Sequence, residues 1–169
     1  MIQERVRPDG RPGEYFSWNE LQTTSTGLRN VAPPEARANL RKLCYLILDP
    51  LRRIVGPVKV NSGYRSLAVN TRIGGSKTSA HMKGLAADIV ALWPTWTAQT
   101  VATLLAASPP EEVPFDQVIL YASGFVHVGL AKEGRSPRRQ LLYSPRGGVY
   151  HQWVPQPEAV EAFRELWDD

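Results

Sequence analysis

The chain has 169 residues and a formal net charge of +4 at pH 7, and 43% of its residues are hydrophobic while 21% are charged. This composition excludes a disordered chain, and the length suffices for one compact domain but is short for two. The mild excess of positive charge suits cell-wall polymer, a membrane surface or nucleic acid as an anionic partner. It suits an ordinary solvated surface equally well.

The N-terminal segment, residues 1–14, is polar and rich in Gly, Pro and Arg, so we expect an extended arm ahead of a single domain over residues 15–169. The segment lacks the apolar core of a signal peptide, and no part of the chain has the roughly 20 consecutive apolar residues of a membrane span. We therefore expect synthesis in the cytoplasm without a signal peptide, with action outside the cytoplasm depending on another route of delivery.

Helices are expected near both ends of the domain. Residues 34–55 carry apolar side chains at helical spacing with Pro34 in the first turn, and Pro50 is expected to kink or split this run before Gly56 ends it. Cys44, the only cysteine, falls within the run and is expected to be a small buried hydrophobe. Further helical segments are expected at residues 15–21, where Ser17 and Glu20 form a capping box, at 97–107 and at 157–167.

Strands are expected in the middle of the chain. The segments with alternating or continuous apolar residues are 58–62, 85–92, 113–121, 125–130, 140–143 and 149–153. A long loop rich in Gly and Ser, residues 63–80, follows the first of them, and a basic loop, residues 132–139, follows the fourth. Helices at both ends with strands between them predict an α+β fold with a small antiparallel sheet and flanking helices.

Two histidines and one aspartate are candidate metal ligands. His81 and Asp88 lie seven residues apart, which fits a ligand in a loop followed by a ligand on the next strand. His127 lies between Val126 and Val128, which face the other side of a strand, so His127 can oppose Asp88 on a neighbouring strand. Two imidazoles and one carboxylate leave one coordination position open, as in hydrolytic zinc sites. The alternative for each is an ordinary hydrogen-bonded polar residue.

The surrounding sequence carries a family pattern. Its parts are Ser62-Gly63-Tyr64-Arg65-Ser66, Gly74-Gly75-Ser76, Ser79-x-His81-x-x-Gly84-x-Ala86-x-Asp88 and Phe125-Val126-His127-Val128. Together they resemble the D-alanyl-D-alanine carboxypeptidase family of zinc peptidases, which includes carboxypeptidases and endopeptidases of bacterial peptidoglycan. The resemblance runs from about Phe16 to about His127 and is greatest to compact, often phage-encoded members.

The resemblance implies the fold of that family, with Zn²⁺ bound by His81, Asp88 and His127, and hydrolysis of an amide bond in the peptidoglycan stem peptide. Arg65 matches the family arginine that faces the substrate carboxylate or the developing oxyanion. Ser79 would orient the loop that carries His81, and would also serve substrate binding. The alternatives are a surface arginine paired with an acid for Arg65 and a simple turn residue for Ser79.

The chain departs from the family at the general base. Related active enzymes usually carry a glutamate a few residues before the last histidine ligand, and here the seven residues before that histidine include no carboxylate. Tyr121 and Gly124 stand where different relatives carry the glutamate. We expect Tyr121 to donate a hydrogen bond to an oxyanion, because an unperturbed pKa near about 10 makes a tyrosine a poor base. Asp116, Glu133 and His151 are alternative bases if they fold into reach.

The absent glutamate leaves two functions open. The first is a zinc hydrolase of stem peptides, either a D,D-carboxypeptidase or an L,D- or D,D-endopeptidase, which turns over slowly. The second is a weak or inactive virion protein of a phage, in the head, neck or tail, which uses the fold for assembly or for binding cell wall, with other phage structural proteins as partners. Nucleic acid is disfavoured as a partner, because the tryptophans are not interleaved with basic residues.

Overall fold

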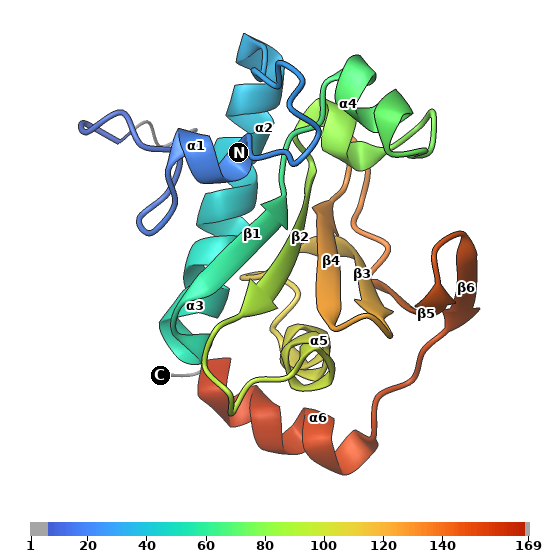
Figure 1. The fold of residues 1–169 in the computed structure, drawn as a ribbon. Helices are drawn as coiled ribbons and strands as arrows, with labels where there is room; N and C mark the ends of the chain where they lie inside the picture. Colours follow the sequence, from blue (N-terminus) through green and yellow to red (C-terminus); the bar gives the residue numbers. More distant parts are fainter. Residues whose placement is uncertain (1–6, 168–169) are drawn as a thin grey trace.

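A computed structural model describes residues 7–167 and shows one six-stranded sheet in the order β1-β2-β4-β3-β5-β6 (Figure 1). The strands are β1 (Val58–Ser62), β2 (Ala86–Ala91), β3 (Phe115–Tyr121), β4 (Phe125–Leu130), β5 (Gln140–Arg146) and β6 (Val149–Gln152). The expected α+β class is confirmed. Within the described residues, no helix combines the length and the apolarity needed to cross a membrane.

The sheet is mixed, so the expectation of a purely antiparallel sheet is wrong at one pair of strands. Four of the neighbouring pairs are antiparallel, but β3 and β5 run parallel, from Gln117 opposite Gln140 to Tyr121 opposite Ser144. The reason is topological. Because β4 runs back along β3, the chain leaves β4 beside the start of β3, and a strand that then adds to the free edge of β3 has the same direction as β3.

The long helical run is split, as the proline within it predicts. It consists of α2 (Pro34–Leu43), a π-helical turn η1 (Cys44–Leu48) and α3 (Asp49–Val55), which begins immediately before Pro50. Proline has no N–H to donate, and the π-helical turn ends with the hydrogen bond from Asp49 N to Cys44 O, immediately before Pro50. Gly56, at φ +76°, ends the run.

The remaining helices are α1 (Trp18–Leu21), α4 (Leu67–Arg72), η2 (Ala80–Lys83), α5 (Ala98–Ala107), α6 (Pro157–Arg164) and η3 (Glu165–Trp167). The expected capping box of α1 is present, with Ser17 N donating to Glu20 at 2.8 Å. The expected loop over residues 63–80 is wrong in part, because it contains α4. This helix is only six residues long and buries little, so it has no apolar periodicity that would predict it.

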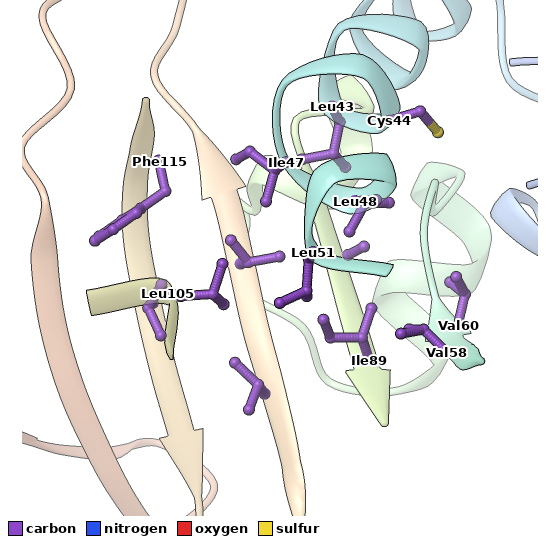
Figure 2. Packing of buried hydrophobic residues seen from close by; sticks show 14 of the residues in the cluster. Leu43, Cys44, Ile47, Leu48, Leu51, Val58, Val60, Ile89, Leu105 and Phe115 are labelled. Atoms are coloured by element: carbon purple, nitrogen blue, oxygen red, sulfur yellow. The ribbon is translucent and has the colours of Figure 1, made fainter. Parts of the chain in front are cut away.

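The core lies on one face of the sheet, where side chains of the split helical run pack against β1 and β2, and Leu105 of α5 lies near Phe115 of β3 (Figure 2). Cys44 is fully buried, as expected, and burial raises the pKa of its thiol. Val126 and Val128 belong to this core, so strand alternation turns His127, which lies between them, toward the opposite face. The candidate site is therefore on the face that the core helices leave open.

The segment before α1 is attached to the helical run. Pro12 and Gly13 are buried, and the backbone N–H groups of Glu14 and Tyr15 donate to the carboxylate of Asp49 at 2.8 and 3.3 Å. Burial raises the pKa of Asp49, although these N–H groups act against the shift. Residues 1–6 of the expected arm, and residues 168–169 at the other end, lie outside the described residues.

Candidate metal centre

The three candidate ligands come from separate elements that the sheet brings together. His81 lies on η2, Asp88 on β2 and His127 on β4, and β2 pairs with β4 so that Asp88 is directly opposite His127. Gly84, at φ +69°, turns the chain from η2 into β2, and a Cβ there would overlap the carbonyl oxygen of Ala36 on α2. The close approach of the two backbones therefore requires glycine.

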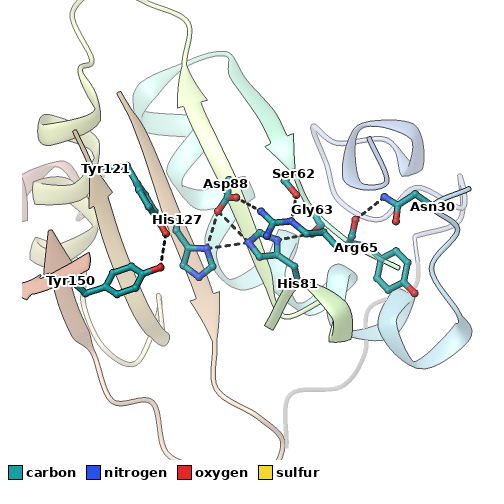
Figure 3. A network of polar contacts seen from close by, with 10 residues as sticks. Asn30, Ser62, Gly63, Arg65, His81, Asp88, Tyr121, His127 and Tyr150 are labelled. Carbon is teal, nitrogen blue, oxygen red and sulfur yellow. Dashed lines mark hydrogen bonds and ion pairs between the residues drawn. The ribbon is translucent and has the colours of Figure 1, made fainter. Parts of the chain in front are cut away.

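The donor atoms of the three residues converge on one point (Figure 3). His127 Nδ1 lies 2.8 Å from Asp88 Oδ1, His81 Nε2 lies 3.2 Å from the same oxygen, and the two ring nitrogens are 3.1 Å apart. All three side chains are buried, and their donor atoms lie within 4.8 Å of one another. The predicted convergence is thus observed, while metal binding itself stays a prediction.

The second ring nitrogen of His81 fixes the orientation and tautomer of the imidazole. His81 Nδ1 lies 2.7 Å from the carbonyl oxygen of Gly63. A carbonyl oxygen only accepts hydrogen bonds, so Nδ1 carries the proton and donates it. The lone pair of Nε2 is left directed at the point where the three donor atoms meet.

Electrostatics favour the protonation states that bind a cation. Burial lowers the pKa of His81, against the opposing effect of Asp88, so the imidazole is neutral at pH 7. Burial by itself raises the pKa of Asp88, but the hydrogen bonds of the two imidazoles, and their charge when they are protonated, outweigh it, and the net shift is downward. A neutral imidazole and an ionised carboxylate are the forms in which these groups ligate metals.

Arg65 contacts the candidate ligand Asp88 directly. Arg65 Nη2 donates to Asp88 Oδ2 at 2.5 Å, and Arg65 Nε donates to the hydroxyl of Ser62 at 2.7 Å. The backbone N–H of Arg65 also donates to the carbonyl of His81 at 3.1 Å. Asp88 therefore turns one oxygen to the imidazoles and the other to the guanidinium. Ser62 and Gly63 were not predicted as contributors. Gly63 acts through its backbone carbonyl on a histidine 18 positions away, which its residue type does not encode.

The buried side chain of Asn30 forms hydrogen bonds with the segment that carries Arg65 (Figure 3). Its amide nitrogen donates to the carbonyls of Gln22 and Tyr64 at 2.9 and 2.8 Å, and its oxygen accepts from the N–H of Ser66 at 2.7 Å. Asn30 thus joins the loop after α1 to the residues on both sides of Arg65.

The cluster lines a cleft of about 1370 Å³, which also includes Arg65, Ser79, Tyr121 and Asp116. Ser79 is the residue immediately before η2, and the N–H of Met82 donates to its carbonyl at 3.2 Å. Its contribution to the turn before His81 is made by the backbone. A smaller cavity of about 590 Å³ between β5, β6 and the following segment has no histidine, cysteine or carboxylate in its lining.

Tyr121 stacks on Phe125, with ring centroids 4.3 Å apart, and its hydroxyl lies 3.5 Å from that of Tyr150 on β6. Burial raises the pKa of Tyr121, and Tyr150 and the charge of Asp88 add to the shift. The phenol therefore stays protonated at neutral pH and is a hydrogen-bond donor. Nothing in the local sequence predicts the contact with Tyr150, which comes from 29 positions further along the chain.

None of the alternative bases, Asp116, Glu133 and His151, is an unpaired base that lines the cleft. Asp116 lines it, but its two oxygens accept hydrogen bonds from Arg138 at 2.6 to 3.1 Å. Glu133 and His151 are exposed and do not line the cleft. Among the described residues, Asp88 and Asp116 are the only carboxylates in the lining, and each is paired with an arginine.

A buried cluster of two imidazoles and one carboxylate, lining an open cleft on one face of the sheet, defines a candidate metal centre of the hydrolytic type. A sequence profile of the family described as Peptidase M15 matches residues 14–129, which is more than half of the chain, and the chain belongs to this family. It is also 40% identical over 77 residues to a zinc D-Ala-D-Ala carboxypeptidase of Streptomyces albus G. That match covers 44% of this chain and 29% of the relative.

Proposed function

We propose that the protein is a zinc-dependent peptidase that hydrolyses an amide bond next to a D-amino acid in the stem peptide of peptidoglycan. The observation that carries the proposal is the convergence of His81, Asp88 and His127 in a large cleft. The relative from Streptomyces albus G, whose name specifies zinc and D-Ala-D-Ala, supports the choice of metal and substrate. On this proposal the protein acts on the cell wall, either after release from the cell or within a virion.

The cluster fits zinc by its donor chemistry. Three protein ligands of the N, N, O type leave one position open, as catalytic zinc sites do. The Gly63 carbonyl behind His81 and the Arg65 guanidinium behind Asp88 are the kind of partners that orient metal ligands. When bound, zinc polarises a substrate carbonyl and lowers the pKa of a bound water to about 7.

The remaining residues of the cleft supply binding and hydrogen bonds. Arg65 uses Nε and Nη2 for contacts with the protein, and its Nη1 has no partner among the described residues. We propose that Nη1 donates to the substrate carboxylate or to the oxyanion that develops on the scissile carbonyl. The protonated hydroxyl of Tyr121 is a second donor in the same cleft, and Ser79 fixes the turn before His81.

Turnover is expected to be slow. Within residues 7–167, no carboxylate in the cleft is free of an arginine partner, so none is available as a general base. A positioned general base contributes about 10²- to 10⁴-fold to a rate. The proposal therefore predicts measurable hydrolysis at a rate well below that of relatives that carry the glutamate.

The test is hydrolysis by the zinc-loaded protein. Release of D-alanine from an N-acylated peptide ending in D-Ala-D-Ala measures carboxypeptidase activity, and new amino groups from purified peptidoglycan measure endopeptidase activity. We expect His127→Ala to abolish either activity. His151→Ala is the matched control, because His151 is exposed and lies outside the cleft. Equal rates for the wild type and His127→Ala would contradict the proposal.

A second candidate function rests on the pairing of both cleft carboxylates with arginine. Without a base, the fold can serve in a phage virion as a head, neck or tail component that binds cell wall without cutting it. This function predicts little or no hydrolysis by the wild type, binding to purified peptidoglycan, and a fixed oligomeric state in solution. A monomer that releases D-alanine would exclude it.

A further inference from the structure

Much of the cleft is built by the part of the chain that follows the family match. The profile ends at residue 129, and 10 of the 27 residues that line the cleft come later, from the end of β4, the loop before β5 and the β5–β6 hairpin. The parallel pairing of β5 with β3 brings these segments to the cleft. This part of the cleft therefore lies outside the segment that the family profile matches, whereas the metal cluster lies within it.

The basic loop, residues 132–139, is fixed at both ends. Just before it, at the end of β4, Leu130 N donates to the carbonyl of Leu85 at 2.8 Å. At its end, the backbone N–H and the guanidinium of Arg138 donate to Asp116, and Arg139 donates to the carbonyl of Ser108 at 2.8 Å. These contacts give Asp116 a structural role, because it anchors the loop against β3.

The cleft carries more positive than negative charge. Its charged lining consists of Arg65, Lys83, Lys132, Arg135 and Arg138, together with Asp88 and Asp116. Arg65 is paired with Asp88 and Arg138 with Asp116. Lys83, Lys132 and Arg135 have no carboxylate partner in the described part of the chain, so three positive charges in the lining are left without a counter-charge.

Two of these charges lie on one turn of the basic loop. The N–H of Arg135 donates to the carbonyl of Lys132 at 3.0 Å, and Gly134, at φ +73°, closes the turn between them. Both side chains line the cleft. A pair of cations on an anchored turn is suited to carboxylates, which accept charge-assisted hydrogen bonds.

We infer that Lys132 and Arg135 form a subsite of the cleft that binds a carboxylate of the peptide substrate. The inference rests on the proposed function, since it assumes a peptide bound in this cleft. Two kinds of carboxylate have the required chemistry: the C-terminal carboxylate of the peptide and an acidic side chain within it. The experiment below separates them.

The experiment measures binding of three N-acetylated peptides to the zinc-loaded protein by calorimetry, with D-alanine release followed in parallel. The first peptide is Glu-Lys-D-Ala-D-Ala with a free C-terminus, the second is its C-terminal amide, and the third has Gln in place of Glu. The double variant Lys132→Gln/Arg135→Gln is compared with Arg29→Gln/Lys59→Gln. Both control residues are exposed and lie outside the cleft, and both double variants lower the net charge equally.

We expect the Lys132/Arg135 double variant to bind the first peptide about 3- to 20-fold more weakly at low ionic strength, as two partly exposed ion pairs imply, and the control variant to bind it like the wild type. The difference should shrink in about 0.5 M salt. If the amide peptide is insensitive to the double variant, the C-terminal carboxylate occupies the subsite; if the Gln peptide is insensitive, the acidic side chain does.

Equal loss of affinity in both double variants, or no loss in either, would overturn the subsite. Failure of the proposed reaction is a separate outcome. A protein that releases no D-alanine but binds acidic peptides through Lys132 and Arg135 loses the proposed activity and keeps the subsite. If the Lys132→Gln/Arg135→Gln variant hydrolyses the peptide as fast as the wild type and binds it equally well, the proposed activity is kept and the subsite is lost.

Discussion

Replacing Tyr121 by glutamate should supply the base that the cleft lacks. Tyr121 is two positions after Ile119, whose register partner across β3 and β4 is His127, so its side chain shares the cleft face with His127. Gly124, the other position at which relatives carry the glutamate, lies in the β3–β4 turn at φ +92° and does not line the cleft. We therefore expect Tyr121→Glu to accelerate hydrolysis and Gly124→Glu to leave the rate unchanged.

The expected gain is about 10²- to 10⁴-fold in kcat, which corresponds to about 2.7 to 5.4 kcal/mol of barrier. The surroundings help, because burial and the negative charge of Asp88, which raise the pKa of the Tyr121 hydroxyl, would also raise that of a carboxyl group there. A carboxyl pKa closer to neutrality makes a better base. The stability cost is the lost stacking on Phe125, about 0.5 to 1.5 kcal/mol.

The assay is release of D-alanine from an N-acylated peptide ending in D-Ala-D-Ala, with each variant zinc-loaded. Tyr121→Gln is the matched control, since it has the shape of glutamate and cannot accept a proton at neutral pH. If Tyr121→Glu is no faster than Tyr121→Gln while both variants remain folded and bind zinc equally, a glutamate at this position does not act as the base.

Three further predictions concern stability. Asn30→Ala should lower the free energy of unfolding by about 2 to 4 kcal/mol in urea denaturation, because the three hydrogen bonds of a buried side chain are lost; a loss under 1 kcal/mol would contradict this. Gly74→Ala and Gly84→Ala both place alanine at φ +69°, but only the latter meets backbone, so Gly74→Ala should cost about 1 to 2 kcal/mol and Gly84→Ala clearly more. Burial alone raises the pKa of Asp116, but hydrogen bonds from Arg138 lower it below 3.8 overall. Asp116→Asn should therefore lower the free energy of unfolding by its full amount above the pKa of this carboxyl group in the unfolded chain. The difference from the wild type should vanish as the pH falls through the lower pKa of the folded chain, which urea denaturation at pH values from about 6 to about 2 would measure.

The strands that carry the ligands were predictable because their signal is local. The apolar run around Asp88 and the valines on both sides of His127 indicate strands with the ligand on the open face, and the structure places the two residues in register. The expectation of a loop at His81 is wrong, because the chain there forms the short 3-10 helix η2. For the two strand ligands, the pattern lies within about ten residues of the residue it predicts.

What the sequence did not predict depends on contacts between distant segments. The parallel placement of β5 depends on which edge of the sheet is free, and no residue within β5 reports that. The contact of Arg65 with Asp88 joins positions 23 apart, and the contact of Tyr121 with Tyr150 joins positions 29 apart. Side-chain partners at such separations follow from the folded topology and not from any local spacing.

Zinc binding by His81, Asp88 and His127 is tested by the metal content of the purified protein after equilibrium dialysis against zinc, measured for the wild type, His127→Ala and His151→Ala. We expect about one zinc ion per chain in the wild type and in His151→Ala, and a large loss of bound zinc in His127→Ala. A wild type that binds no zinc, or a His127→Ala variant that binds as much as the wild type, would contradict this expectation.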